Sequence, residues 1–176
     1  MGVMNRLNGI KLNDLWKTPS YAVKPLLPYL KPGSHILCPF DRRESAFVET
    51  LLEAGHIVTR SHIDYGEDFF DYRPDFLNVD YIISNPPYSI KDKVFEHLFY
   101  LGKPFAMLMT CNGLFEGKRF DLFKNKKLEI MWLKPRVAFL DETGKPQKSP
   151  PFASCYVCHR VLPKAHIFVE MEKEAR

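Results

Sequence analysis

Apolar runs of strand length alternate along the chain with segments that carry apolar residues at helical spacing. Helices are expected over 44–54 and 91–101, because Gly55 and Gly102 follow the last periodic residues as helix C-caps. Strand-like runs cover residues 35–40, 57–63, 81–84, 105–109, 128–133 and 152–161. Strands that alternate with helices are typical of a parallel α/β sheet.

The end of the chain departs from this alternation. No helical pattern separates the runs 128–133 and 152–161, and the turn signal Asp141-Glu-Thr-Gly144 lies between them. We therefore expect these two strands to form an antiparallel hairpin at the edge of the sheet. The longest piece without a regular pattern, 111–125, contains two glycines and several basic residues. A long basic loop of this kind is more often functional than merely connecting.

The size and charge of the chain restrict the class of protein. The 176 residues, 45% of them hydrophobic and 26% charged, indicate a single soluble domain with a substantial core. No run approaches the roughly 18 apolar residues of a membrane span, and residues 1–12 lack a signal-peptide core. We therefore expect a cytoplasmic protein without a membrane partner. The net charge of +4 is small for a nucleic-acid-binding protein, so its basic residues must cluster if they are to contribute.

The cysteines raise the question of a haem or metal site. Cys155-Tyr-Val-Cys158-His159 matches the C-x-x-C-H pattern of haem attachment, which requires an exported chain. The segment instead has the pattern of a buried strand, in which Cys155 and Cys158 face opposite sides of the sheet. Zinc would need further ligands, and the sequence has no second cysteine pair. We expect reduced, buried cysteines and no metal site.

Asn85-Pro86-Pro87-Tyr88 follows the predicted strand 81–84 and is the most informative segment. The prolines fix their own backbone angles and lack N–H groups, which gives a rigid turn with free carbonyl groups. Asn85 adds a side-chain oxygen, and Tyr88 adds a ring on which a heterocycle can stack. Such a turn suits the amino group of a nucleobase. A plain turn at a strand end would have the same local pattern, so this alternative stays open.

These four residues resemble the [Asn/Asp]-Pro-Pro-[Tyr/Phe] motif of S-adenosylmethionine-dependent amino-methyltransferases, above all the N6-adenine enzymes. The resemblance to small phage or prophage adenine methyltransferases extends over nearly the whole chain. It implies a Rossmann-like class I methyltransferase fold: a mostly parallel sheet with an antiparallel edge hairpin and helices on both faces. One domain, 1–176, would then contain a cofactor-capping segment at 1–30 and a small substrate-recognition insertion at 111–127.

The resemblance also implies residues that bind S-adenosylmethionine. Trp16-Lys-Thr18-Pro19 resembles a Trp-x-Thr-Pro segment that caps the cofactor. Cys38-Pro39-Phe40-Asp41 resembles Asp-Pro-Phe-x-Gly-x-Gly at the end of the first strand, although Cys38 replaces the acid and no glycine follows. Asp41 is the candidate substitute for that acid. Asp64 matches the ribose-binding acid, while Asp68 and Phe69 match the pocket for the cofactor's adenine.

The implied chemistry is methyl transfer from a sulfonium to an amine. The Asn85 side-chain oxygen and the Pro86 carbonyl would accept hydrogen bonds from the amine and stabilise positive charge as the methyl arrives. An adenine in a duplex would first be flipped out of the stack. Tyr88 and Phe152 would hold the flipped base on its two faces. Neither a dedicated general base nor a metal is required.

The acceptor is expected to be adenine N6 in DNA. Phosphate contacts are expected from basic residues in loops around the pocket, namely Lys118, Arg119, Lys148, Lys124, Lys126, Lys127 and Lys145. Little of the chain is left to recognise a base sequence, which leaves open low specificity, a homodimer or a separate specificity subunit. The alternatives are adenine N6 or guanine N2 in RNA, a protein glutamine, and a non-catalytic domain that binds nucleic acid.

Overall fold

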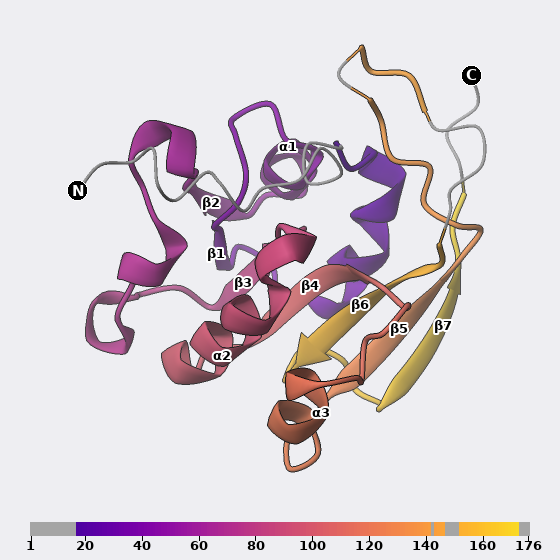
Figure 1. The fold of residues 1–176 in the computed structure, drawn as a ribbon. Coiled ribbons are helices and arrows are strands. Elements are labelled where there is room, and N and C mark those ends of the chain that lie inside the picture. The colour runs from indigo at the N-terminus through magenta and orange to yellow at the C-terminus, as the bar shows by residue number, and fades with distance from the viewer. Residues whose placement is uncertain (1–16, 142, 147–151, 173–176) are drawn as a thin grey trace.

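The computed structural model describes residues 17–141, 143–146 and 152–172, which contain one seven-stranded sheet (Figure 1). The order of the strands across the sheet is β2-β1-β3-β4-β6-β5-β7. Their bounds are β1 His35–Cys38, β2 Ile57–Arg60, β3 Tyr81–Ser84, β4 Phe105–Thr110, β5 Glu129–Lys134, β6 Ser154–His159 and β7 His166–Glu170. Each of the first six strands falls within or within one residue of a predicted run.

The sheet is mostly parallel. Strands β2, β1, β3 and β4 pair in parallel, as do β5 and β7, while β6 runs antiparallel to both of its neighbours. This confirms the predicted α/β class with one reversed strand. The strands of the predicted hairpin, β5 and β6, pair antiparallel near the edge, and the edge strand itself is β7, which the sequence analysis missed. Its five residues contain the apolar run Ile167-Phe168-Val169 between His166 and Glu170, and this short run was the available signal.

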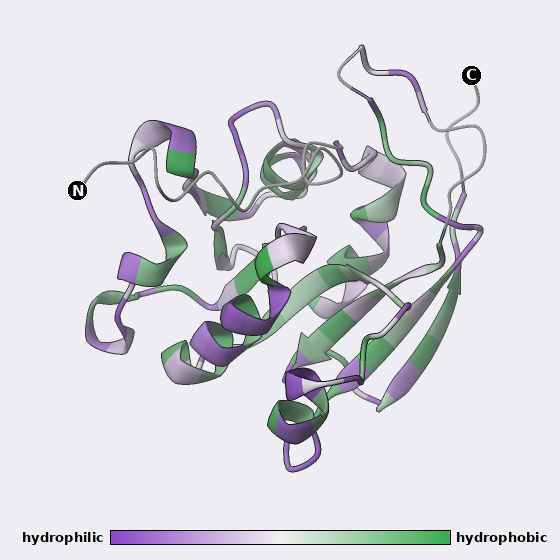
Figure 2. Cartoon of the chain, in the orientation of Figure 1, coloured by the Kyte–Doolittle hydropathy of each residue, from purple (hydrophilic) through white to green (hydrophobic). Residues whose placement is uncertain are grey.

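Helices cover both faces of the sheet, as predicted. Helix α1, Ala46–Glu53, and the 3₁₀ helices Ser20–Ala22 and Lys24–Tyr29 pack on one face. Helix α2, Lys91–Leu101, has the predicted bounds and packs on the other face with the short helix α3, Lys118–Phe123. Figure 2 shows hydrophobic residues concentrated on the strands and hydrophilic ones on the outward side of α2.

The segment 111–125 was expected to be irregular but contains helix α3. Arg119, in its first turn, is buried and pairs with Asp92 of α2. Its guanidinium also donates to the carbonyl oxygens of Gly113 and Leu114. Burial of this charge requires such a complete set of partners. Arg119 therefore holds the segment against α2, a role that its basic character alone did not reveal.

Between β2 and β3 the chain forms the 3₁₀ helices Ile63–Tyr65, Phe69–Asp71 and Pro74–Phe76, and no strand. The cysteines of β6 follow the prediction, since Cys155 and Cys158 belong to hydrophobic clusters on opposite faces of the sheet. Within the described part of the chain, no group of three or more potential ligands could hold a metal ion, and no helix could cross a membrane.

The segment before α1 is tied to the second half of the chain by backbone contacts. Lys17 and Leu140 exchange two backbone hydrogen bonds, with N···O distances of 3.0 and 2.8 Å. The buried Tyr156 hydroxyl of β6 donates to the Ala22 carbonyl at 2.7 Å, and the Tyr21 hydroxyl accepts from the Ala138 N–H at 2.9 Å. These bonds fix residues 17–22 against the sheet.

Replacing Tyr156 by phenylalanine should destabilise the protein by about 1–3 kcal/mol, because the buried Ala22 carbonyl would lose its donor. Urea unfolding measures this change. Tyr100→Phe, at a tyrosine that is 56% exposed, is the matched control and should leave the midpoint nearly unchanged. Equal midpoints for the Tyr156→Phe variant and the wild type would show that this bond does not anchor the segment.

Candidate functional site

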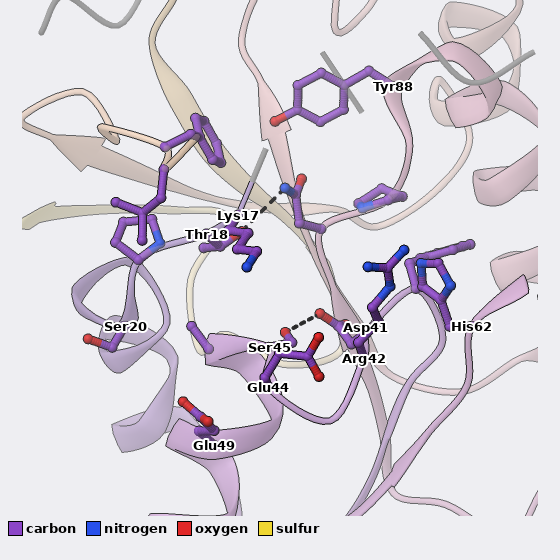
Figure 3. Close-up of a pocket in the computed structure, with 17 residues that line it drawn as sticks. Lys17, Thr18, Ser20, Asp41, Arg42, Glu44, Ser45, Glu49, His62 and Tyr88 are labelled. Carbon is purple, nitrogen blue, oxygen red and sulfur yellow. Dashed lines mark hydrogen bonds between the residues drawn. The ribbon is translucent and has the colours of Figure 1, made fainter. Parts of the chain in front are cut away.

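A cavity of about 390 Å³ lies at the carboxyl ends of β1 and β3 (Figure 3). Ligands bind at this end of open α/β sheets, and the volume falls within the range of about 300–1,000 Å³ for small-molecule sites. The wall comes from five parts of the chain: residues 17–20, the segment from the end of β1 into α1, His62 after β2, the turn after β3, and residues 139–140. Its lining residues are Lys17, Thr18, Pro19, Ser20, Phe40, Asp41, Arg42, Glu44, Ser45, Ala46, Glu49, His62, Asn85, Pro86, Tyr88, Phe139 and Leu140.

Asn85, the first residue after β3, has one satisfied and one unsatisfied side-chain group. Its Nδ2 donates to the Thr18 hydroxyl oxygen at 3.3 Å. Its Oδ1 is buried and has no hydrogen-bond partner among the described residues. A buried acceptor without a donor costs about 1–3 kcal/mol, so proteins rarely keep one without a function. Because Asn85 lines the cavity, this oxygen is an acceptor for a ligand N–H or O–H group.

The rest of the turn supplies apolar and aromatic surface. Pro86 is buried and Tyr88 is half-buried, and both line the cavity. The Tyr88 ring meets the Phe152 ring edge to face, with centroids 6.1 Å apart and planes at 63°. Phe152 also contacts Phe139, at 6.4 Å. The structure thus brings Tyr88 and Phe152 into direct contact, so a base could enter between them only if the rings separated, and their role in holding a base stays a prediction.

Asp41 joins the elements that surround the cavity. Its buried carboxylate accepts hydrogen bonds from Ser45, the N-cap of α1, and from Ser84, the last residue of β3. Burial raises the pKa of Asp41 to about 6, although the two serine hydroxyls oppose the rise by stabilising the charge. Asp41 therefore lines the cavity and holds its wall through two serine residues, of which Figure 3 shows Ser45.

The candidate ribose ligand, Asp64, does not line the cavity. It forms an ion pair with Arg42 and lies 3.3 Å from Nδ1 of His62, and both of these partners do line it. Burial lowers the pKa of His62, and the Arg42 charge acts in the same direction, while the Asp64 carboxylate opposes them. Asp64 therefore contacts two residues of the cavity wall, Arg42 and His62, but does not line the cavity itself.

The residues predicted to form the pocket for the cofactor's adenine, Asp68 and Phe69, also have other contacts. Asp68 caps a 3₁₀ helix by accepting from the Phe70 N–H at 3.0 Å, and Phe69 is buried against Phe40 with ring centroids 5.0 Å apart. Neither Asp68 nor Phe69 lines the cavity, whereas Phe40 does. The sequence cannot distinguish a core phenylalanine from one that stacks on a ligand, because both occur in the same apolar surroundings.

Cys38 and Pro39 do not line the cavity, although they precede lining residues in the sequence. Cys38 is fully buried in β1, and burial raises the pKa of its thiol. The Pro39 carbonyl accepts from the Ser61 hydroxyl at 3.3 Å. Lys118 is exposed on α3 away from the lining residues, and Arg119 is held by Asp92 as described above. Trp16 and Lys148 lie outside the described residues.

Sequence reasoning missed several lining residues. Glu44 and Glu49 come from the start of α1, His62 follows β2, and Lys17 and Leu140 pair across the cavity. The signal for the first three was their position at the carboxyl ends of parallel strands or at the beginning of the next helix. The pairing of Lys17 with Leu140 has no local signal, because 122 intervening residues separate the two positions.

Comparison with known proteins adds only a distant similarity. No protein-family model matches the sequence, and no characterised protein is significantly similar to it. Among solved structures, the chain is similar to the release-factor-specific protein-(glutamine-N5) methyltransferase of Alicyclobacillus acidocaldarius, with a TM-score of 0.48 and 14% identity. The match covers 80% of this chain and 93% of that one. A similarity this distant carries no information about the substrate.

The raised pKa of Asp41 predicts a specific pH dependence of stability. Because the folded state keeps this proton at higher pH than the unfolded state does, Asp41 destabilises the fold as pH rises from about 4 to above 6. The shift from 3.8 to about 6 corresponds to about 3 kcal/mol. The difference in unfolding free energy between the wild type and Asp41→Asn should therefore change by this order over that interval.

Urea unfolding at a series of pH values measures this difference. Asp75→Asn, which alters an exposed carboxylate, is the control and should track the wild type. Parallel curves for the wild type and Asp41→Asn would contradict a buried carboxyl group with a raised pKa.

Proposed function

We propose that this protein is an S-adenosylmethionine-dependent methyltransferase that modifies an exocyclic amino group, with adenine N6 in DNA as the leading acceptor. The observation that carries the proposal is the buried Asn85 Oδ1, which has no partner among the described residues and belongs to a cavity-lining side chain. It lies in an Asn-Pro-Pro-Tyr turn at the carboxyl end of β3. The motif suits a bound amine, and the unsatisfied oxygen is an acceptor that the hydrogen of such an amine would fill.

The cavity has side chains suited to the cofactor. Glu44 and Glu49 offer negative charge to its ammonium and sulfonium groups, and Lys17 offers positive charge to its carboxylate. Phe40 offers an apolar surface. When bound, S-adenosylmethionine supplies an electrophilic methyl group on a positively charged sulfur. Asp64 and Asp68 do not line the cavity and have other partners. We therefore assign cofactor binding to the residues that line the cavity.

Asn85 and its neighbours would perform the positioning. The Thr18 hydroxyl accepts from Asn85 Nδ2, and this bond orients the amide so that Oδ1 remains available. Oδ1 and the Pro86 carbonyl accept the two amine hydrogens, which favours a pyramidal nitrogen and stabilises its developing charge. The nitrogen held in line with the methyl group would form the N–C bond as the S–C bond breaks, the thioether would leave, and the methylated nitrogen would lose one proton to water.

The aromatic residues at the turn favour a nucleobase as acceptor. Tyr88 and Phe139 line the cavity, and Phe152 contacts both rings. Planar bases stack on such surfaces, whereas an aliphatic amide gains less from them. Adenine N6 or guanine N2 in RNA and a protein glutamine remain alternative acceptors. A homodimer or a separate subunit could supply sequence recognition, since the insertion at 111–127 is small.

Replacing Asn85 by alanine should reduce methyl transfer by about 100-fold or more, because the oxygen that stabilises charge in the transition state is removed. Cofactor binding should change much less. Initial rates with radiolabelled S-adenosylmethionine measure the first effect, and a binding titration measures the second. Asn125→Ala, at an exposed asparagine, is the matched control. Full activity of Asn85→Ala would refute the proposed role.

Labelled cofactor incubated separately with DNA, RNA and protein should identify the acceptor. After digestion of the nucleic acids to nucleosides, we expect the label in N6-methyl-2′-deoxyadenosine from DNA. Label in RNA nucleosides or in protein glutamine would reassign the acceptor while keeping the enzyme class. Absence of label in all three would favour a non-catalytic domain that binds nucleic acid.

A further inference from the structure

A group of aromatic side chains lies on the sheet far from the cavity. Trp132 of β5 and Phe168 of β7 are directly paired across the two strands, and His166 is two residues before Phe168. The strand order places β5 and β7 at the opposite side of the sheet from β1 and β3, whose ends form the cavity. We call Trp132, His166 and Phe168 the aromatic patch.

The rings of the patch are nearly parallel. The planes of Trp132 and Phe168 differ by 20°, with centroids 6.3 Å apart, and the planes of Trp132 and His166 have the same angle and separation. The indole N–H of Trp132 also donates to Nδ1 of His166 at 3.3 Å. This bond limits rotation of the indole ring. The patch is therefore organised before any ligand arrives.

The patch is open to solvent. Phe168 is 80% exposed, and among the described phenylalanine residues only Phe76 is more exposed. Helices α2 and α3 lie over β3, β4 and β6 on this side of the sheet, and Figure 1 shows no described helix in front of β7. Trp132 is partly buried and packs against the core, whereas the exposed ring of Phe168 adds little to it.

Positive charge gathers next to the patch. Lys126 and Lys127 precede β5 by three and two residues, and Lys164 precedes β7 by two residues. Since β5 and β7 are parallel, these lysines lie at the same end of the two strands. The nearby acid, Glu129, already accepts the backbone N–H groups of residues 160–162, at 3.0 to 3.3 Å. At the other end, Lys134 and Glu170 form an exposed pair.

We propose that the aromatic patch binds single-stranded nucleic acid, with one or more bases stacked on Phe168 and Trp132 and phosphates contacting the lysines at the start of β5 and β7. Flat, preorganised rings beside a cluster of cations are the features by which proteins bind single strands without sequence preference. A duplex keeps its base faces stacked on one another and cannot use such rings. This site is separate from the cavity and does not depend on methyl transfer.

The test uses fluorescence anisotropy of the full chain with a labelled oligothymidylate of about a dozen nucleotides, without cofactor. Phe168→Ala should weaken binding about five-fold or more, and Phe168→Tyr should retain it because the ring is preserved. Phe168→Leu should behave as the alanine variant, since it keeps apolar area without a stacking face. Phe76→Ala, at a phenylalanine that is 88% exposed on another part of the surface, is the matched control.

Lys164→Gln should reduce the dependence of binding on salt concentration. An exposed sheet edge can also bind a second copy of the chain. Light scattering on the same samples detects such a dimer by its mass. The proposal would be overturned if Phe168→Ala bound the oligonucleotide with wild-type affinity, or if a duplex of the same length bound equally well. It would also be overturned if the protein formed a dimer that dissociated in Phe168→Ala while oligonucleotide binding did not change. Retained binding by an inactive Asn85→Ala variant would separate this site from the proposed enzyme site.

Discussion

The geometry of the cavity depends on the buried carboxyl group of Asp41. It accepts hydrogen bonds from the N-cap of α1 and from the last residue of β3, so it fixes the loop after β1 relative to the Asn-Pro-Pro-Tyr turn. Burial opposes ionisation of this group, and the two serine hydroxyls recover only part of that cost. A protein that retains such a costly group gains a defined distance between two ligand-binding loops.

The hydrogen bond between Thr18 and Asn85 also joins two parts of the cavity wall, because it links the segment before α1 to the turn after β3. This segment is itself held by Tyr156 and by backbone pairing with Leu140. Two parts of the chain that are distant in sequence thus meet at one asparagine side chain. Their convergence leaves Oδ1 buried without a partner among the described residues, which is the feature that relates the fold to its chemistry.

The sequence predicted the features that arise from local patterns. Helix α2 has the expected bounds, and β3 and the turn after it were recognised because two prolines follow an apolar run. Edge strand β7 was missed because five partly exposed residues give a weak signal. In the site, Asp41 and Asn85 were predicted, but Glu49 and Leu140 were not. Their positions depend on how α1 and the segment after β5 pack, which no short motif encodes.

The most direct test of cofactor binding in the cavity is a calorimetric titration of the purified protein with S-adenosylhomocysteine, the demethylated product of the proposed cofactor. The account predicts binding close to one molecule per chain, abolished by Ala46→Trp, which places a large side chain at the cavity wall while circular dichroism remains unchanged. No heat of binding to the wild type, or equal binding by a folded Ala46→Trp variant, would contradict the assignment of this cavity to the cofactor.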